Sequence, residues 1–351
     1  MKYYIIAGEA SGDLHASNLV AEIKKKDKKA AFRGCGGDLM KAQGVELLKH
    51  YRTMAYMGFV EVAVNLRKVL SNIAQCKKDI VDYHPDAVIL VDYPGFNLRI
   101  ADFAHEKGFK VLYYISPQVW AWKRSRVHRI RKSVDKMLVI LPFEEEFYKR
   151  YGVDVTFVGN PLLDELAKVG TGNRSIFLRR HSLGERREII ALLPGSRRQE
   201  VKRTLPVMIK VASHFPDYQF VVAGVSSLEK SLYKDIMGRS DVFFVENQTY
   251  ELLQNSSAAL VTSGTATLET ALLSIPEVVC YKATGFSYRL AKWMIKVKYI
   301  SLVNLIMDKE VVKELVQGDL NEDNLVKELD QLLHNGKRQR QLLEDYEELK
   351  D

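Results

Sequence analysis

Short polar turns that follow apolar runs hold the residues best suited to chemistry. The first such turn, GEASGD at residues 8–13, follows the apolar run 3–7. Its glycines allow close backbone approach, and the helix expected after it points amide groups at the opening. Ser11 and Gly12 are therefore candidate ligand contacts. The alternative is a structural turn in which Ser11 or Asp13 caps the helix.

Asp92 is the best candidate for a general base. It follows the apolar run 87–91 and begins the segment DYPGFN, which places a carboxylate beside a rigid Pro-Gly bend. In an open parallel sheet, ligands bind outside the carboxyl ends of the strands, where this residue would lie. An ionised aspartate can accept a proton from a hydroxyl that attacks an electrophile. The alternative is an aspartate that bonds its own loop backbone.

A cluster of cations follows the next predicted strand. Residues 116–122 read SPQVWAW, and the following KRSRVHRIRK is rich in Lys and Arg, with no acid before Asp135. The candidates for binding a substrate phosphate or anionic lipid head groups are Arg124, Arg126 and Arg129. The two tryptophans beside them could stack on bases or lie at a membrane interface. The alternative is a solvated helix face with the tryptophans in the core.

Two turns in the second half suit a nucleotide diphosphate. The predicted strand 188–193 is followed by a helix that begins with Gly195, Ser196 and Arg197. Unbonded backbone amides, the positive end of the helix dipole and the paired N–H donors of the guanidinium would all favour a bound diphosphate. Residues 262–269, TSGTATLE, follow another strand and supply small hydroxyl side chains at a helix start, although such a motif is usually only a cap. The candidate ligand contacts of this turn are Ser263, Gly264, Thr265 and Glu269, the last as an acceptor for ribose hydroxyls.

The sequence gives little support to other kinds of chemistry. Its histidines lack ligand spacing, no Asp-x-Asp pair stands beside a nucleotide turn, and a G-x-S-x-G nucleophile elbow is missing. We therefore expect no metal and no cofactor. The remaining residues predict transfer between a nucleotide-activated donor and a hydroxyl acceptor.

A repeated strand-turn-helix pattern must position these turns. Continuous apolar runs are typical of parallel strands covered by helices on both faces, and residues 34–37 are interpreted as a further tight turn. The fold class is therefore α/β, with two Rossmann-like, doubly wound parallel-sheet domains facing a central cleft. The predicted strands are 3–7, 87–91, 110–115, 137–141, 155–158, 188–193, 219–223, 242–245, 258–261 and 278–281.

Glycines near residue 170 break the apolar pattern and separate the two halves. We assign residues 1–165 to a domain that holds the acceptor and residues 175–320 to a nucleotide-binding domain. Residues 321–351 form a charged helical tail that packs on the first domain or on a partner subunit, or stays solvated.

Composition limits the setting and the partners. A length of 351 residues suits two domains, and the net charge of +8 favours an anionic partner. Three scattered cysteines and a start unlike a signal peptide predict a reducing cytoplasm. No run approaches the ~20 apolar residues of a spanning helix, so membrane contact is expected to be peripheral.

Two apolar segments with neighbouring cations are candidates for contact with a bilayer surface. In one of them, Arg67 and Lys68 flank apolar residues, and in the other, residues 286–300, aromatic side chains interleave with Lys and Arg. Core packing is the alternative for the first and an ordinary amphipathic helix for the second. The apolar positions of the first segment are Val60, Val62, Leu66, Val69 and Leu70.

Taken in order, several segments closely resemble the lipid A disaccharide synthase family. The resemblance spans almost the whole chain, and SPQVWAWKRSRV is especially specific, whereas SGTATLE recurs among many glycosyltransferases with paired Rossmann-like domains (GT-B). The segments are GEASGD, MGFVEV, LVDYPGFN, YYISPQVWAWKRSRV, LPFEEEFY, LLPGSRRQEV, SGTATLE and SLVNL.

The resemblance implies an inverting, metal-independent transferase of lipid A and lipopolysaccharide biosynthesis. It would join UDP-2,3-diacylglucosamine to 2,3-diacylglucosamine 1-phosphate (lipid X) in a β-1',6 linkage and release UDP. Asp92 would deprotonate the acceptor's 6-hydroxyl, while Ser196 and Arg197 neutralise the leaving diphosphate. Glu269 and the amides of residues 263–265 would hold UDP, and the cations around 124–131 would meet the acceptor phosphate. Ser11 and Asn304 would line the cleft. Residues 1–165 would then be an acceptor- and lipid-binding domain, residues 175–320 a UDP-sugar-binding domain, and the first apolar segment a contact for acyl chains.

The resemblance also implies a setting. The enzyme is expected to be cytoplasmic and peripheral on the cytoplasmic face of the inner membrane, without a nucleic-acid partner. Family members can dimerise through an exchanged C-terminal region, so a homodimer is a further expectation. Relatives usually continue for another helical stretch beyond the point matching Asp351, which is a departure from the family pattern. Two alternatives remain open: another UDP-sugar enzyme of the same fold, either a transferase or an epimerase, and a non-catalytic basic module that binds nucleic acid or membrane.

Overall fold

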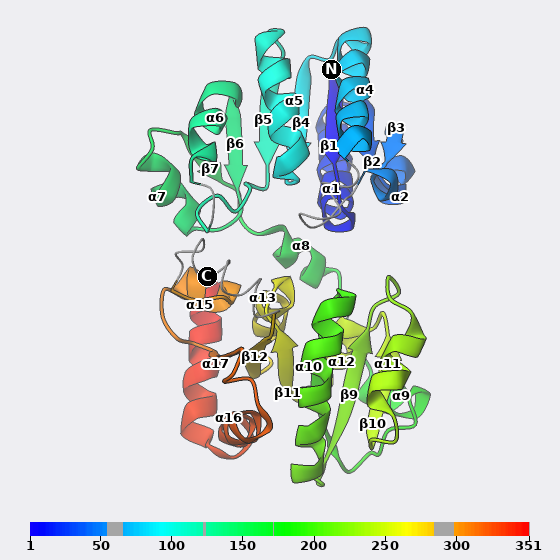
Figure 1. Ribbon diagram of the computed structural model, residues 1–351, viewed down its shortest axis with the longest axis vertical. Helices are drawn as coiled ribbons and strands as arrows, with labels where there is room; N and C mark the ends of the chain where they lie inside the picture. Colours follow the sequence, from blue (N-terminus) through cyan, green and yellow to red (C-terminus); the bar gives the residue numbers. More distant parts are fainter. Residues whose placement is uncertain (55–65, 122–123, 171, 284–297, 351) are drawn as a thin grey trace. The chain divides into compact units, whose positions relative to one another are not determined.

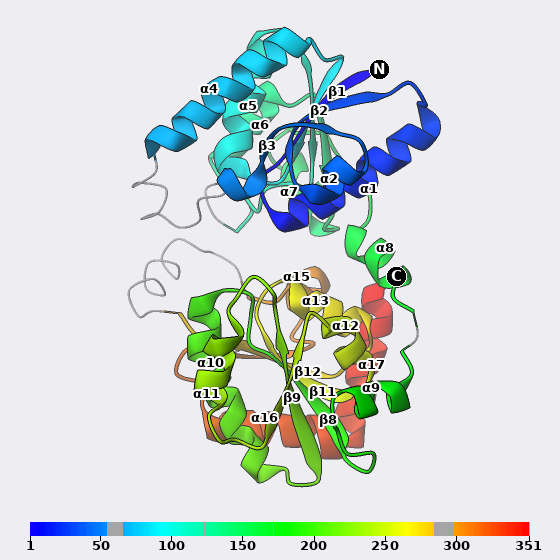
Figure 2. The ribbon, with the colours of Figure 1, turned by 90° about the vertical axis from the view of Figure 1, so that its right-hand side faces the viewer.

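A computed structural model describes residues 1–54, 66–121, 124–170, 172–283 and 298–350. The chain divides into two compact units, Met1–Pro161 and Leu162–Asp351. Each unit is a parallel β-sheet with helices on both faces, as the ribbon views in Figure 1 and Figure 2 show. The prediction of two doubly wound α/β domains is therefore confirmed.

The first unit contains a seven-stranded parallel sheet in the order β3-β2-β1-β4-β5-β6-β7. The strand order reverses between β1 and β4, so the carboxyl ends of these two strands flank a topological switch point. The strands are β1 (Lys2–Ala7), β2 (Ala31–Gly36), β3 (Glu46–His50), β4 (Ala87–Val91), β5 (Lys110–Tyr114), β6 (Lys136–Val139) and β7 (Val155–Phe157). The helices are α1 (Ala10–Lys26), α2 (Asp38–Ala42), α4 (Leu66–Tyr83), α5 (Pro94–Glu106), α6 (Arg126–Ser133) and α7 (Phe143–Lys149), with a 3₁₀ turn at Tyr51–Thr53.

Alternating side chains of the first sheet build two cores. In β4, Val88 and Leu90 pack with residues of α4 to α7, whereas Ile89 and Val91 pack on the opposite face with α1 and α2. All five residues of β4 are buried, as expected for a strand covered on both faces. The sheet can therefore hold the turn at Asp92 rigidly.

The second unit repeats this plan with a six-stranded parallel sheet in the order β10-β9-β8-β11-β12-β13. Its switch point lies between β8 and β11. The strands are β8 (Glu188–Leu193), β9 (Tyr218–Gly224), β10 (Val242–Glu246), β11 (Ser256–Thr262), β12 (Glu277–Tyr281) and β13 (Lys313–Val316). The helices are α8 (Pro161–Ala167), α9 (Arg174–Arg180), α10 (Arg198–Val211), α11 (Lys230–Met237), α12 (Thr249–Gln254), α13 (Thr265–Leu272), α15 (Leu302–Met307), α16 (Glu322–His334) and α17 (Gly336–Lys350), with a 3₁₀ turn at Ala212–His214.

The C-terminal tail belongs to the second unit. Buried residues of α16, such as Leu325 and Leu329, and of α17, such as Leu342 and Tyr346, join the core formed by β8 and α10. Apolar burial on this scale fixes both helices. The alternative in which the tail stays solvated is therefore wrong.

Three short strands were not predicted from the sequence. The segment interpreted as a tight turn at residues 34–37 mostly forms β2, in register with β1. Gly34 serves close strand packing there, because a Cβ atom on it would lie 1.9 Å from the Ile5 carbonyl oxygen. The strands β3 and β13 are only partly buried, so their sequences lack a continuous apolar run.

Candidate active site

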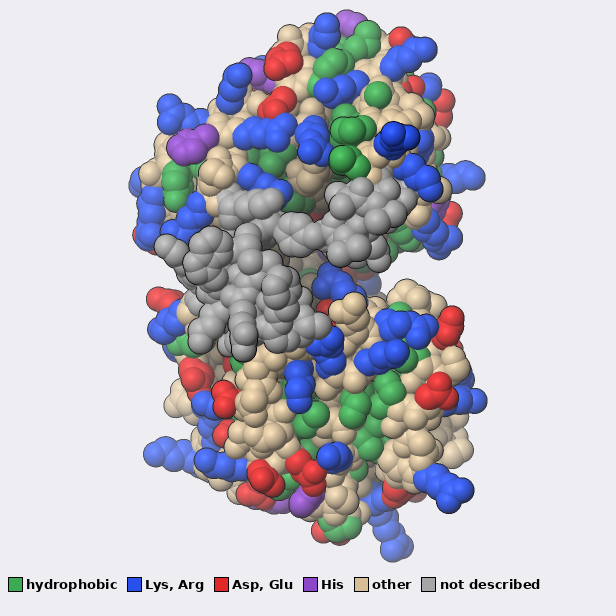
Figure 3. Space-filling view, viewed as in Figure 1, with side chains coloured by type: hydrophobic (Ala, Val, Ile, Leu, Met, Phe, Trp, Pro, Cys, Tyr) green, Lys and Arg blue, Asp and Glu red, His purple; other side chains and the backbone are tan. Residues whose placement is uncertain are grey.

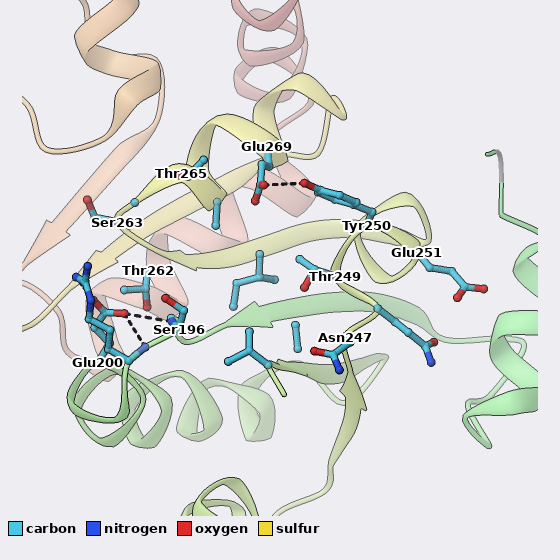
Figure 4. A pocket seen from close by; sticks show the side chains of 18 residues that line it. Ser196, Glu200, Asn247, Thr249, Tyr250, Glu251, Thr262, Ser263, Thr265 and Glu269 are labelled. Carbon is cyan, nitrogen blue, oxygen red and sulfur yellow. Dashed lines mark hydrogen bonds and ion pairs between the residues drawn. The ribbon is translucent and has the colours of Figure 1, made fainter. Parts of the chain in front are cut away.

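A pocket of about 710 Å³ opens at the switch point of the second sheet. Residues that follow β8, β9, β10 and β11 line it, and Figure 4 shows the side chains from these four strand ends converging on one space. The predicted contacts Gly195, Ser196, Arg197, Ser263, Gly264, Thr265 and Glu269 are all among the lining residues. The structure thus brings the two turns predicted to suit a diphosphate together.

The turn after β8 already holds a carboxylate. Glu200 Oε2 accepts hydrogen bonds of 3.2 Å from the amides of both Ser196 and Arg197, and its Oε1 lies 3.1 Å from the Arg197 guanidinium. A side chain at Gly195 would collide with this carboxylate, at 2.5 Å from its Oε2 atom, and Gly195 also has a φ of +106°. Glu200 therefore fixes the geometry of the turn and the direction of Arg197.

The turn after β11 is organised differently from the prediction. The amide of Ser263 donates to the Cys280 carbonyl and its hydroxyl to the Ile300 carbonyl, so the amide is committed to the fold rather than to a ligand. Glu269 lies one turn into α13 and accepts a 2.7 Å hydrogen bond from the Tyr250 hydroxyl, drawn in Figure 4. Burial raises the pKa of the Glu269 carboxyl, and the Tyr250 bond opposes this rise.

The turn after β10 was missed as a ligand site. Its lining residues include polar side chains at one wall of the pocket, and Tyr250 reaches across to Glu269. The rule that ligands bind at strand carboxyl ends applies to this strand as well, so the predicted strand 242–245 carried a usable signal. The added lining residues from this turn are Asn247, Gln248, Thr249, Tyr250 and Glu251.

Asp92 lies at the switch point of the first sheet, directly after β4. Its backbone is left-handed with φ of 43°, and that of Tyr93 is left-handed too, with φ of 47°. Burial, together with the negative charge of Glu9, the N-cap residue of α1, raises the pKa of the Asp92 carboxyl to about 7. A carboxyl with this pKa can take up a proton near neutral pH, which is the property of a general base.

The glycine turn after β1 presents an exposed serine and also caps a neighbouring helix. Ser11 is exposed in the first turn of α1, where a ligand could reach it, whereas Gly12 is buried. Asp13 does not cap its own helix. Its carboxylate accepts from the amides of Gly37, Leu39 and Met40 at 2.7 to 3.2 Å and so caps the start of α2.

Comparison with known proteins decides the family. A sequence model described as "Lipid-A-disaccharide synthetase" matches residues 3–350. The chain belongs to the lipid-A-disaccharide synthetase family. A curated lipid-A-disaccharide synthase from Syntrophus aciditrophicus is 43% identical over 99% of this chain and 92% of its own length. The family assignment made from the sequence is confirmed, and with it glycosyl transfer in lipid A biosynthesis.

Solved structures share the fold of this chain. A glycosyltransferase of kitacinnamycin superposes with a TM-score of 0.65 at 12% identity, covering 99% of this chain and 94% of its own. The UDP-GlcNAc 2-epimerase from Neisseria meningitidis, solved with UDP-GlcNAc, gives a TM-score of 0.70 at 13% identity over 98% of this chain and 94% of its own. At such low identity these likenesses concern the fold alone.

The basic segment of this family member is only partly available to a ligand. Arg129 is committed to Asp102, with its Nε atom 2.5 Å from Oδ2, and Asp102 also accepts from Ser133. Arg124 is exposed, while burial lowers the pKa of the half-buried Arg126, with Arg129 and Arg99 adding to the effect. Trp120 is buried in a T-shaped contact with Phe143, as expected if it belongs to the core.

The apolar residues predicted to contact lipid between residues 60 and 70 differ in exposure. Leu66 and Leu70 of α4 are exposed, at 46% and 49%, whereas Val69 is buried in the core of the first unit. Val69 was therefore wrongly assigned to lipid contact, because it faces the sheet one helical step away from the exposed residues. Val60 and Val62, and most of the segment 286–300, lie outside the described residues.

Asn304 was also wrongly assigned to ligand contact. Its side chain is fully buried, donates to the Val312 carbonyl and to Glu314, and accepts from the amides of Val311 and Val312 at 2.8 to 2.9 Å. These bonds tie α15 to β13, so the residue stabilises the fold.

Within the described part of the chain, no three His, Cys, Asp or Glu side chains are grouped so that they could hold a metal ion. No described helix is long and apolar enough to cross a membrane.

Proposed function

We propose that the chain transfers 2,3-diacylglucosamine from its UDP derivative to the 6-hydroxyl of 2,3-diacylglucosamine 1-phosphate. The products are the β-1',6-linked disaccharide 1-phosphate and UDP. Family membership supports the reaction, and the observation that carries the assignment of roles is the pocket that joins Arg197 and Glu269 at the switch point of the second sheet.

UDP is proposed to occupy this pocket. Glu269 would accept from the ribose hydroxyls through Oε2, because Oε1 is bonded to Tyr250. The diphosphate would lie at the start of α10, where Arg197, which is largely exposed, can donate several N–H groups. Negative charge grows on the diphosphate as the glycosidic bond breaks, so the guanidinium stabilises the transition state more than the ground state.

Asp92 is proposed as the general base. As the acceptor's 6-oxygen attacks the anomeric carbon, its proton passes to the Asp92 carboxylate, and the electrons of the breaking bond leave with UDP. A single attack from the face opposite the diphosphate inverts the anomeric centre. The pKa of about 7 allows the carboxylate to be ionised before the attack and basic enough to accept the proton during it.

The positive charge of the chain supports an anionic acceptor. Lys plus Arg equals Asp plus Glu in the second unit, so the whole net charge of +8 belongs to the first unit. Figure 3 shows Lys and Arg side chains interspersed with hydrophobic ones over that unit. We propose that Arg124 and Arg126 bind the acceptor's 1-phosphate, a role for which Arg129 is less suited because it pairs with Asp102.

We also propose that the enzyme works as a peripheral protein on the cytoplasmic face of the inner membrane. The exposed Leu66 and Leu70, with Arg67 and Lys68 beside them, suit a surface where acyl chains and anionic head groups meet. A homodimer is proposed as well, and light scattering on the full chain would measure its mass.

The experiment that tests the proposed chemistry compares Asp92→Asn with the wild type. We expect turnover to fall at least 100-fold, in the range that loss of a general base produces, while calorimetric UDP binding is unchanged. Near wild-type turnover would overturn the base assignment. Consumption of UDP-diacylglucosamine without disaccharide would instead favour hydrolysis or epimerisation.

A further inference from the structure

The backbone at Asp92 is held in an unfavourable conformation. Asp92 and Tyr93 are consecutive non-glycine residues with φ near +45°. Each left-handed residue of this kind costs about 1 kcal/mol or more, and two in succession persist only where surrounding contacts over-determine them. A loop-capping aspartate alone would need no such arrangement.

Two fully buried side chains hold the main chain there. The Tyr113 hydroxyl of β5 donates to the Asp92 carbonyl at 2.5 Å, and Asn97 Nδ2 of α5 donates to the same carbonyl at 2.8 Å. Asn97 Nδ2 also lies 3.1 Å from the Val91 carbonyl. The peptide unit between Asp92 and Tyr93 is thus hydrogen-bonded both by the neighbouring strand β5 and by the following helix α5.

The next residue is fixed independently. The Tyr93 hydroxyl donates to the Met54 carbonyl at 2.8 Å, and the Tyr93 ring lies so close to Gly8 that a Cβ atom there would stand 2.2 Å from it. These contacts hold Tyr93 in its left-handed conformation. The direction of the Asp92 side chain therefore depends on the bonds to the Asp92 carbonyl and on the contacts of Tyr93.

Neither donor can touch a substrate. Tyr113 and Asn97 have no exposed surface. Burial of a hydroxyl and an amide in this core is costly unless each finds a partner, so apolar side chains would fill the same space at lower cost. The buried Tyr113 hydroxyl is explained by the Asp92 carbonyl that it bonds, and the Asn97 amide by that carbonyl together with the carbonyls of Val91 and Ile6.

We infer that Tyr113 and Asn97 are positioning residues that aim the Asp92 carboxylate by clamping its main-chain carbonyl. The inference rests on the proposed function of Asp92 as base. Displacement of a reacting group by about 1 Å can cost up to 100-fold in rate. Loss of either donor should therefore lower turnover without removing a substrate contact.

The test is the variant Tyr113→Phe, with Tyr148→Phe as its matched control. Tyr148 is another fully buried tyrosine of the first unit, and its hydroxyl bonds Ser116 at 2.7 Å. We expect Tyr113→Phe to lower kcat about 10- to 100-fold with little change in KM, and to displace the acid limb of the pH profile. Tyr148→Phe should lose a similar amount of thermal stability and leave kcat within about 2-fold.

A double-mutant cycle separates positioning from general damage. In the Asp92→Asn background, where residual turnover is followed with labelled donor at high enzyme concentration, adding Tyr113→Phe should cost nothing further. An equal loss in both backgrounds, or a Tyr113→Phe enzyme that matches Tyr148→Phe, would overturn the inference while leaving the base role intact. Wild-type turnover by Asp92→Asn would overturn the base role itself. Asn97→Ala, which removes the other donor, serves the same cycle if Tyr113→Phe does not fold.

Discussion

The Tyr250 hydroxyl donates a hydrogen bond of 2.7 Å to Oε1 of Glu269. The two residues come from different turns of the pocket, α12 and α13, and both line it. Burial raises the pKa of the Tyr250 hydroxyl, so it stays a donor at any physiological pH. The bond therefore fixes the rotamer of the carboxylate and favours its ionised form.

We predict that Tyr250→Phe weakens UDP binding about 2- to 10-fold, the equivalent of one net hydrogen bond. The carboxyl of Glu269 would then lose its orienting partner and its pKa would rise further. Calorimetric titration with UDP measures the change. Tyr346→Phe is the control, because the Tyr346 hydroxyl is buried without a hydrogen-bond partner among the described residues, and it should bind UDP like the wild type.

The rate should depend on pH through Asp92. Protonation of a base abolishes its action, so kcat/KM should rise with pH through about 7 and then level off. Glu9 contributes to the raised pKa by like-charge repulsion, so Glu9→Gln should move this acid limb to lower pH. If the acid limb of the kcat/KM profile of Glu9→Gln stayed at the wild-type pH, the charge of Glu9 would not affect the pKa of Asp92 in the working enzyme.

Gly8→Ala should damage the first unit's site without touching a substrate contact. The new methyl group would meet the Tyr93 ring at 2.2 Å and force it to move. We expect a loss of about 1–3 kcal/mol in the free energy of unfolding, as for other overpacked sites, and a kcat at least 10-fold lower. Gly95→Ala, where a Cβ atom meets nothing within 4 Å, is the matched control and should change neither quantity markedly.

Asp13 should matter for stability. It is 3% exposed, and its carboxylate serves three amides at the start of α2. Loss of an N-terminal cap costs about 1–2 kcal/mol, so Asp13→Ala should lower the free energy of unfolding in urea by about 2 kcal/mol. An unchanged urea midpoint would contradict this prediction, because it would mean that water bonds the three amides as favourably as the carboxylate does.

Glu277 should make stability fall as pH rises. Both of its carboxyl oxygens are buried without a partner among the described residues, and burial raises its pKa well above the usual value. The folded state therefore binds a proton that the unfolded state releases above about pH 4.3. This contribution to stability is complete below that pH and is lost progressively as pH rises towards the folded-state pKa. Glu277→Gln should accordingly gain stability over the wild type at pH 8 and lose that advantage at pH 4.

Much of the fold and part of the site could be predicted because apolar runs and the turns after them are local in sequence. Asp92, Arg197 and Glu269 all follow predicted strands, and parallel topology puts strand carboxyl ends at one edge of each sheet. The prediction at Gly34 was wrong because its glycine serves a neighbouring strand, a tertiary cause that local composition does not reveal.

Polar residues were harder to interpret than apolar ones. The family resemblance assigned Asn304 to the cleft, yet the amide of its side chain bonds backbone groups eight residues away. Glu144, in the first turn of α7, is buried and accepts hydrogen bonds from the amides of Ile140 and Leu141, which its sequence position alone does not reveal. Partner choice depends on three-dimensional packing, which motif spacing does not specify.

The central claim is that this chain forms a glycosidic bond between two acylated sugars. Mass spectrometry of a reaction containing the purified chain, UDP-2,3-diacylglucosamine and 2,3-diacylglucosamine 1-phosphate measures it directly. The account predicts the disaccharide 1-phosphate and UDP in equal amounts with wild type, and a rate at least 100-fold lower with Asp92→Asn. UDP release without disaccharide, or undiminished synthesis by Asp92→Asn, would contradict it.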